Sequence, residues 1–360
     1  MSAPVRTTTV HQRSSRVAAW NPAKLFSPRN IVVLVILVAV LAFAPTALGA
    51  YWTRIFTVCT IFSIAAAGIA LLYGRLGLVS LGQVSLIGVG GWITLRVGHA
   101  TSLPFEVVLI IAAVGTGAIG VLVGLPALRL SGLNLAIVTL MLAGAFEVIF
   151  TVTGFPNGGD GFLGRAEGGV LQQPLARPAL GTSDPDYFRY VIIVATLMFL
   201  VIGLHLSNRP GRAWAAIRQS EAGALAAGIG TVRYRLWALA VVSATTGVAG
   251  GLLAGNAGLL DPISFKAPAS ILLFATVLIG GAFSLLGALI AGFLSQGLPP
   301  LLNALGVDGN LIFVLLGVGM IQAITTAPQG IAGQLQGLGR LIRVRVAGVR
   351  ETRRTGRTPR

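Results

Sequence analysis

The residues best suited to chemistry lie in a short polar segment that interrupts an otherwise apolar sequence. From Leu76 to Trp92 the chain reads LGLVSLGQVSLIGVGGW, which combines hydroxyl and amide side chains with five glycines. We expect such a segment to be broken and to line a cavity, because lipid cannot satisfy its polar side chains or any exposed backbone group. The alternative, for each residue alone, is a serine bonded to its own helix or a glutamine that bridges two helices. The candidates for lining a translocation path are Ser80, Gly82, Gln83, Ser85 and Gly88.

A second stretch, residues 207–235, has the composition of a docking loop. It is a charged segment between two apolar runs and reads SNRPGRAWAAIRQSEAGALAAGIGTVRYR. Ser220 is a good N-cap, Glu221 places a negative charge in the first turn, and Gly228 suits the left-handed residue that ends a helix. The loop therefore predicts a helix of about two turns over 221–227. Its apolar face consists of Ala222, Leu225, Ala226 and Ile229.

A helix this short is marginal alone and has to pack against its own domain or another protein. An ordinary capped connector between two membrane spans is the alternative to a docking helix.

The reactive side chains argue against an enzyme and against a bound cofactor. The single cysteine, Cys59, allows no intramolecular disulfide and no cysteine-based metal site. The three histidines, His11, His99 and His205, are scattered along the chain. No GxxxxGK[ST] motif occurs, so this chain is not expected to bind ATP in a P-loop. A membrane enzyme is therefore the least favoured of the functions considered.

The composition is that of a polytopic membrane protein. Of 360 residues, 55% are hydrophobic, only 10% are charged and 48 are glycine. The formal net charge of +16 would suggest nucleic acid as a partner of a soluble protein. In a membrane protein, cytoplasmic retention and contact with anionic lipid explain it, so we expect membrane lipids and no nucleic acid.

Apolar runs predict an all-α bundle of about ten transmembrane helices. Runs near 20 residues are long enough to cross about 30 Å of hydrocarbon. The first, 31–50, follows a basic tail (1–30) and is expected to be a retained anchor. The uncharged stretch 267–307 accommodates two short spans, or else a re-entrant hairpin. The other predicted spans are 55–73, 76–95, 107–128, 132–152, 190–206, 236–256 and 311–327.

The basic residues predict the orientation of these spans. With both termini cytoplasmic, 20 of the 26 Lys and Arg residues lie on the cytoplasmic side, a strong positive-inside bias. The loop 207–235 is then cytoplasmic, whereas the loop 153–189 and Asp308 are external. A transmembrane domain over 31–335 would be followed by an Arg-rich cytoplasmic tail, 336–360.

Two further features of the spans, their glycine spacing and one acidic residue, lead to predictions about helix packing. Glycines recur at close helical spacing, as in Gly117 and Gly120 or Gly247 and Gly250, which lets helix backbones approach in lipid. Glu147 is the only acid inside a predicted span, and we expect a structural role through snorkelling or pairing with Arg96.

The loop 207–235 resembles the cytoplasmic coupling loop of ABC-importer permeases. GRAWAAIRQSEAGALAAGI, residues 211–229, is similar to the form GRALRAIRxNExAAxALGI of branched-chain amino acid permeases. In that family the loop contacts the ATPase. The resemblance makes the following residues candidates for that contact: Arg212, Glu221, Ala222, Leu225, Gly228 and Ile229.

Three more stretches, in order, resemble the same family. The polar segment 76–92 is similar to its GxxGQxSLGQAAFxGIGAY signature, and LRLSGLNLAIVTL (128–140) to LRLxGxYLAIxTL. SFKAPASILLFATVLIGGAFSLLGALIAGFL, which begins at Ser264, is similar to SFxxSxxxLxMVVLGGxGSLxGPxxGA. Together they resemble the M-type (LivM) permease subunit, with departures at Leu86, Asn134 and Ala282.

The resemblance implies a permease subunit of a binding-protein-dependent ABC importer in the bacterial plasma (inner) membrane. Its implied partners are ABC ATPase subunits, which bind the ATP, a second homologous permease and an extracytoplasmic substrate-binding protein. Branched-chain amino acids are the implied substrates, and urea or short-chain amides, carried by other members of the family, are the alternative. An ion-coupled secondary transporter is less expected, because it normally needs titratable groups inside the membrane.

Overall fold

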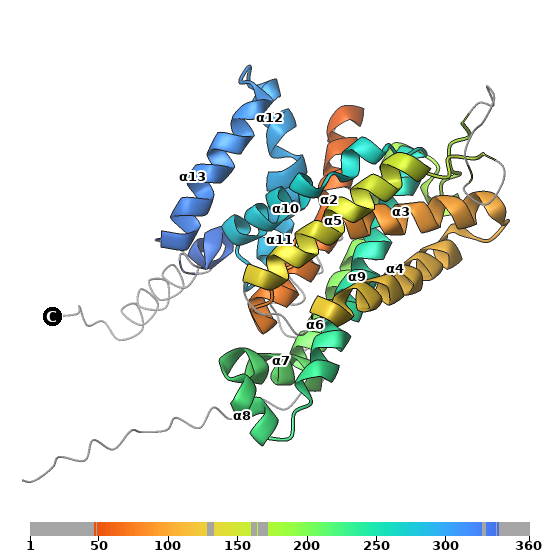
Figure 1. Cartoon of the computed structure of the whole chain (residues 1–360). Helices are drawn as coiled ribbons and strands as arrows, with labels where there is room; N and C mark the ends of the chain where they lie inside the picture. The colour runs from red at the N-terminus through yellow and green to blue at the C-terminus, as the bar shows by residue number, and fades with distance from the viewer. Residues whose placement is uncertain are drawn as a thin grey trace, which may run out of the picture.

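The computed structural model describes residues 47, 49–127, 133–159, 164, 172–325, 329–335 and 337. Within these ranges the chain forms helices joined by loops and contains no β-strand (Figure 1). Five helices are long and apolar enough to cross a membrane, or six if one bent pair counts as a single span. The predicted all-α polytopic membrane fold is confirmed. The two basic tails and nearly all of the first predicted span lie outside the described residues.

The helices follow the predicted apolar runs closely. A π-helical turn, η2 (Leu72–Leu76), continues the first described helix. The α-helices of the first half are α2 (Ala50–Leu71), α3 (Gln83–Ala100), α4 (Phe105–Ala127), α5 (Leu133–Thr153) and α6 (Asp184–Ser207). Those of the second half are α7 (Arg209–Gln219), α8 (Glu221–Ala226), α9 (Thr231–Ala257), α10 (Ala267–Gly280), α11 (Leu285–Gln296), α12 (Leu298–Ala304) and α13 (Ile312–Thr325). Short 3-10 turns occur at Ala179–Gly181, Pro262–Phe265 and Gly309–Leu311.

The stretch 267–307 does not form two equal spans. It contains the 14-residue α10, followed by α11 and α12, whose axes differ by 49°. The bend falls at Gly297, and α12 begins with Leu298-Pro299-Pro300. Proline is tolerated in a first helical turn but cannot continue a preceding helix, so the local sequence accounts for the break. The number of complete crossings beyond the five or six long spans remains a prediction.

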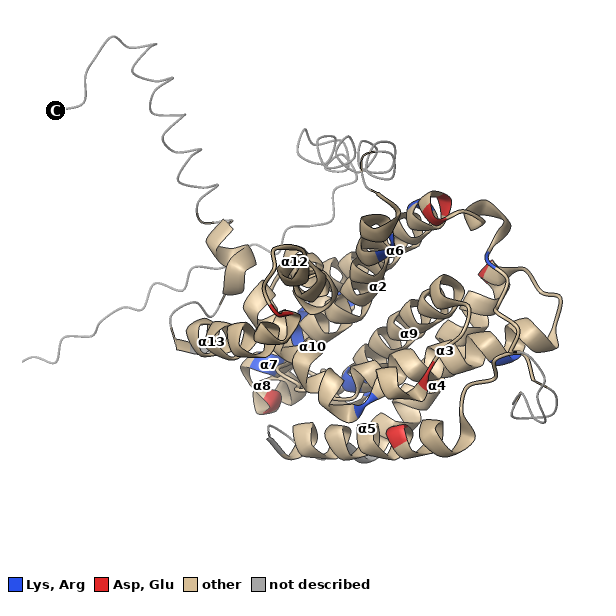
Figure 2. Cartoon of the chain, turned by 90° about the horizontal axis from the view of Figure 1, so that it is seen from above, with Lys and Arg blue, Asp and Glu red and all other residues tan. Residues whose placement is uncertain are grey.

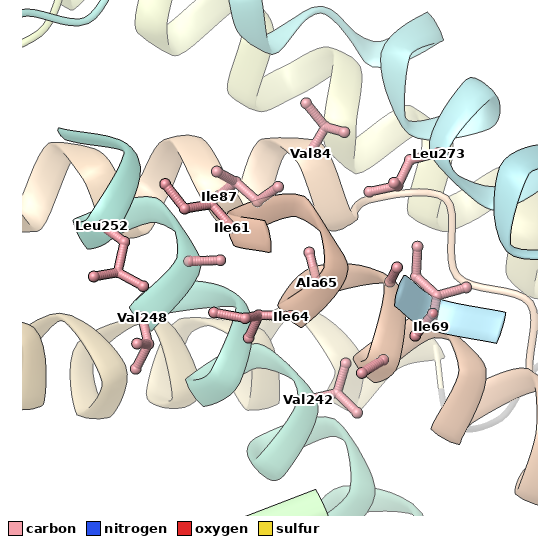
Figure 3. Packing of buried hydrophobic residues seen from close by; sticks show 14 of the residues in the cluster. Ile61, Ile64, Ala65, Ile69, Val84, Ile87, Val242, Val248, Leu252 and Leu273 are labelled. Carbon is pink, nitrogen blue, oxygen red and sulfur yellow. The ribbon is translucent and has the colours of Figure 1, made fainter. Parts of the chain in front are cut away.

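The core is built around α2 and α9. Inside the protein, 72% of the α2 span and 67% of the α9 span are buried, against 22% for α5 and 28% for α6. Ile61 and Ile64 of α2 pack with Val248 of α9, and this contact continues through the apolar cluster shown in Figure 3. Because α5 and α6 leave most of their apolar surface exposed, they lie at the periphery of the bundle.

Glycines of α9 make the close helix contacts that their spacing predicts. A Cβ at Gly120 of α4 would overlap Ser243 of α9, and one at Gly117 would lie 3.3 Å from Ala244 Cβ. On another face of α9, Gly247 and Gly250 meet Gly90 of α3, backbone against backbone. The small-residue faces therefore serve packing: they let α3 and α4 approach α9 within the distance that only glycine allows.

Replacing Gly90 by alanine should destabilise the fold. The new Cβ would lie 2.7 Å from Gly247 Cα, closer than real Cβ contacts are found, so the helices would have to separate. Overpacking of this kind costs about 1–3 kcal/mol. The midpoint of thermal unfolding of the detergent-purified chain measures the loss. The matched control is Gly317→Ala in α13, where nothing lies within 4 Å of the added carbon, and equal midpoints for the two variants would contradict the packing argument.

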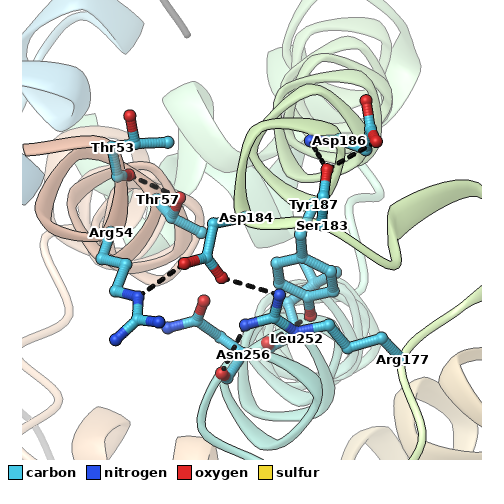
Figure 4. A network of polar contacts seen from close by, with 10 residues as sticks. All are labelled: Thr53, Arg54, Thr57, Arg177, Ser183, Asp184, Asp186, Tyr187, Leu252 and Asn256. Carbon is cyan, nitrogen blue, oxygen red and sulfur yellow. Dashed lines mark hydrogen bonds and ion pairs between the residues drawn. The ribbon is translucent and has the colours of Figure 1, made fainter. Parts of the chain in front are cut away.

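An ion-pair network ties the starts of α2 and α6 to the end of α9 (Figure 4). Asp184 accepts hydrogen bonds from Arg54 Nε and Arg177 Nη1, each at 2.7 Å. Arg177 also donates to the Asn256 carbonyl at 3.3 Å and lies over the Tyr187 ring. Since Arg54 is 67% exposed and Arg177 only 23%, the Arg177 pair contributes the larger share of this stabilisation.

Charged residues are sparse along the long helices (Figure 2). Two segments that connect the long helices lie at opposite ends of the molecule. The turn between α12 and α13, which contains Asp308, is at the end opposite α7 and α8 (Figure 1). The predicted topology likewise separates loop 207–235 from Asp308, and the assignment of one side as cytoplasmic and the other as external stays a prediction.

Cysteine labelling should report these two sides. In a Cys59→Ala background, Asp308→Cys should react with a membrane-impermeant maleimide added to intact cells. Ala227→Cys, an exposed position next to α8, is the control and should react only after permeabilisation. Labelling of position 308 solely in permeabilised cells would contradict the topology.

Candidate functional site

The polar segment 76–92 is broken, as its composition predicts. The π-helical turn η2 ends at Leu76, and Gly77 has the positive φ of 71° that favours glycine. Residues 77–82 form no helix, and α3 begins at Gln83. A break at this depth is tolerated because protein, not lipid, surrounds the freed backbone groups.

Side chains of three other helices satisfy this break. Leu81 N donates to Thr139 Oγ1 of α5 at 2.9 Å, and Val84 N donates to Ser270 Oγ of α10 at 3.2 Å. Gln83 is fully buried, and its Oε1 accepts from Thr246 Oγ1 of α9 at 2.9 Å. The glutamine thus bridges α3 and α9, as the structural alternative for this residue predicts.

The five predicted path residues do not share one environment. Ser80, Gly82 and Gln83 line a common cavity. Ser85 is completely buried and donates to the Ala143 carbonyl of α5 at 3.4 Å. A Cβ at Gly88 would lie 2.7 Å from the Phe150 ring, so this glycine packs against an aromatic side chain. The geometry separates a lining group of three residues from two residues used for packing.

The cavity has a volume of about 50 Å³ and lies between the broken segment and helices α4, α5 and α9. A volume of this size holds a few water molecules and no amino acid. Its lining adds three polar residues that the sequence motifs did not single out: Thr139, Ser243 and Arg235. Among the described lining residues Arg235 carries the only charge. The cavity is therefore narrow and mostly apolar, with a few polar side chains in its lining.

The capped loop helix forms as predicted and ends one residue earlier, at Ala226. Ser220 Oγ accepts from Gly223 N at 3.1 Å, which caps the N-terminus of α8. At the other end Gly228 has φ 76°, and Ile229 N donates to the Ala224 carbonyl at 2.9 Å. This six-to-one bond across a left-handed glycine completes the helix C-terminus.

The predicted apolar face of α8 is open to solvent. Ala222 and Ala226 are exposed, Leu225 is 56% exposed, and Ile229 is half-buried. Ala224, on the other face, is the buried residue through which α8 rests on its own domain. An exposed leucine on so short a helix fits a surface that a partner covers. Arg212 is exposed on the neighbouring α7.

The preceding helix, α7, anchors the loop to the membrane domain. Trp214 is completely buried and its Nε1 donates to the Tyr234 carbonyl at 2.8 Å. Arg218 donates to the Gly74 carbonyl in η2, and its guanidinium lies 5.0 Å from the Phe283 ring centre. Arg218 thus connects the loop to the turn that precedes the broken segment, and Trp214 connects α7 to the start of α9. The sequence motifs contain both residues but do not indicate these contacts.

A single ion pair joins α8 to the cavity. Arg235 Nη2 donates to Glu221 Oε2 at 2.8 Å. Glu221 is 48% exposed at the start of α8, whereas Arg235 is 14% exposed and lines the cavity. Arg235, which pairs with the candidate coupling residue Glu221, thus lines the same cavity as the candidate path residues Ser80 and Gln83.

Glu147 has a structural partner, although not the one expected. Its Oε2 accepts a hydrogen bond at 2.8 Å from Ala267 N, the first residue of α10. A carboxylate is favourable there because helix N-termini carry unpaired N–H groups and a positive partial charge. The expected pairing with Arg96 is replaced by this helix cap.

The described part of the outer loop 153–189 packs on the connection between α9 and α10. Asn157 exchanges two hydrogen bonds with the backbone of Leu260, at 3.0 and 3.2 Å. Leu175 N donates to the Gly258 carbonyl at 2.9 Å. These contacts hold the described part of the loop against this end of the molecule. Docking of an external protein at this loop stays a prediction. Within the described ranges no cluster of three or more His, Cys, Asp or Glu residues could hold a metal ion.

Fold and site together define a membrane transport protein: a helical bundle with a polar break inside it and an exposed, capped loop helix outside it. The model of the family described as "Branched-chain amino acid transport system / permease component" matches residues 51–324. The chain belongs to this family.

Two curated relatives carry the name "High-affinity branched-chain amino acid transport system permease protein LivM". The protein of Escherichia coli (strain K12) is 30% identical over 257 residues, which cover 66% of this chain and 60% of the relative. That of Salmonella typhimurium (strain LT2) is 29% identical over 259 residues, with the same coverage. The chain thus matches about three-fifths of the length of these relatives. No solved structure matches it.

Proposed function

We propose that this chain is a LivM-type permease subunit of an ABC importer in the bacterial inner membrane, and that it carries branched-chain amino acids. The match to the permease family over 51–324 and the multi-pass helical fold support this assignment. The protein would form half of a translocation path with a second homologous permease. An extracytoplasmic binding protein would deliver the substrate.

The observation that carries the proposal is the physical connection between α8 and the polar break. The apolar face of α8 is exposed, as a docking surface for an ATPase would require. From α8, the Glu221–Arg235 pair reaches the cavity that Gln83 also lines, and Arg218 of the adjacent α7 reaches η2. A partner that displaces α7 and α8 together would act on η2 and on the arginine that lines the cavity.

The energy source in this proposal is ATP bound by separate subunits, because the chain contains no P-loop motif and its loop helix suits docking. In this proposal the cavity of about 50 Å³ is a narrow section of the path, too small for an amino acid. Alternating access would open it when the ATPases move the coupling helices, in the way that rigid-body rocking opens other transporters.

The substrate is tested by uptake into proteoliposomes that contain the complete transporter, purified through a tag on this chain and supplied with its binding protein. Labelled leucine, isoleucine and valine should accumulate only with ATP, and an excess of unlabelled leucine should abolish uptake. Urea and acetamide serve as competitors for the alternative substrate class. Transport of these amides without transport of leucine would overturn the substrate assignment.

A further inference from the structure

Arg235 has an unusual environment for a cationic side chain. It is 14% exposed at the beginning of α9 and is the charged residue among the described residues that line the cavity. One of its donors, on Nη2, is used by Glu221. Its Nε is buried and has no hydrogen-bond partner among the described residues.

An unpaired, buried guanidinium N–H calls for an acceptor. Arginine presents its five donors in a rigid planar fork that matches a carboxylate or a phosphate, and of these two groups an amino acid carries the carboxylate. Within the described lining of the cavity there is no acidic residue to take this role. The rest of the polar lining consists of hydroxyl and amide groups, on Ser80, Gln83, Thr139 and Ser243.

We propose that Arg235 binds the carboxylate of the amino acid in transit, at the cytoplasmic end of the path. The inference rests on the proposed function and adds to it a substrate-binding residue and a ligand class. Glu221 neutralises Arg235 while the path is closed. When the cavity widens, the substrate carboxylate takes the free donors, while Nη2 stays paired with Glu221.

This role has a consequence for substrate class. Urea and short-chain amides can accept hydrogen bonds from a guanidinium, but they are neutral and cannot form the bidentate ion pair that a carboxylate forms with it. The geometry at Arg235 therefore favours amino acids over the neutral substrates that other members of the family carry.

A double-mutant cycle between Arg235 and Glu221 tests the proposal in the complete, reconstituted transporter. The variants are Arg235→Gln, Glu221→Gln and the double variant, and the readout is the maximal rate of leucine uptake at saturating binding protein. Arg235→Gln should lower this rate at least about tenfold in both backgrounds, because the substrate contact does not depend on Glu221. Arg235→Lys should recover part of the rate, since it keeps the charge but loses the planar fork.

Two outcomes would overturn the inference. If Arg235→Gln has no effect once Glu221 is Gln, or if Glu221→Gln alone abolishes uptake, the arginine acts only through the ion pair. Normal uptake by Arg235→Gln would also refute it. Failure of the proposed function is distinguishable, because the wild-type transporter itself would then carry none of the three branched-chain amino acids. Co-purification of the ATPase subunits with each variant confirms assembly.

Discussion

Replacing Leu225 by Asp should abolish ATP-driven uptake. Leu225 is 56% exposed at the centre of the apolar face of α8, and the cap of this helix does not involve its side chain. A charge placed in an apolar docking contact costs at least about 2 kcal/mol, or roughly 30-fold in the docking equilibrium. The measurement is co-purification of the ATPase subunits together with binding-protein-stimulated ATP hydrolysis in liposomes. Both should be lost.

Leu305→Asp is the matched control, with the same chemical change at a leucine that is 70% exposed in the turn after α12. This turn lies at the other end of the molecule (Figure 1), so uptake should stay within about twofold of wild type. If Leu225→Asp retains both ATPase binding and stimulated hydrolysis, α8 is a connector and not a transmission element.

Replacing Gly82 by leucine should block transport without preventing assembly. Gly82 lies directly before α3, lines the cavity, and has a φ of −113° that any residue can adopt. An added Cβ would be 3.3 Å from the Thr139 carbonyl, a tight contact that a small shift relieves. The remaining carbons of leucine would occupy a space that holds only a few waters. Uptake should therefore fall below detection, while the complex elutes normally in size-exclusion chromatography.

The control for this substitution is Gly144→Leu in α5, where no atom lies within 4 Å of an added Cβ. That variant should transport at nearly the wild-type rate. Normal transport by Gly82→Leu would instead mean that the break at 77–82 serves packing alone.

Local patterns predicted a large part of this protein because the relevant interactions act over a few residues. The cap at Ser220, the left-handed Gly228 and the exposed face that contains Leu225 all follow from spacing within one short segment. The break before Gln83 was predictable for the same reason, since glycines and polar side chains at membrane depth cannot form a lipid-facing helix. Span boundaries followed from the length of the apolar runs.

Path residues were predicted less well, because a one-dimensional pattern does not tell which side of a helix faces an empty space. Gly82 and Gly88 look alike in the sequence, yet one lines the cavity and the other packs against Phe150. The partner of Glu147 was likewise missed, because its hydrogen bond goes to Ala267 N, a backbone group 120 residues away.

The sequence by itself determined that this is an all-α membrane protein, where most of its long helices lie, and that a capped apolar helix lies in its most basic internal loop. Those properties depend on hydropathy, on capping and on charge, which are local. Only the tertiary structure decided that Arg235 joins Glu221 to the cavity, that Arg218 reaches Gly74, and that Gln83 pairs with Thr246. The contact between Gln83 and Thr246 forms where glycines let α3 approach α9 closely, and hydropathy does not indicate which helices cross.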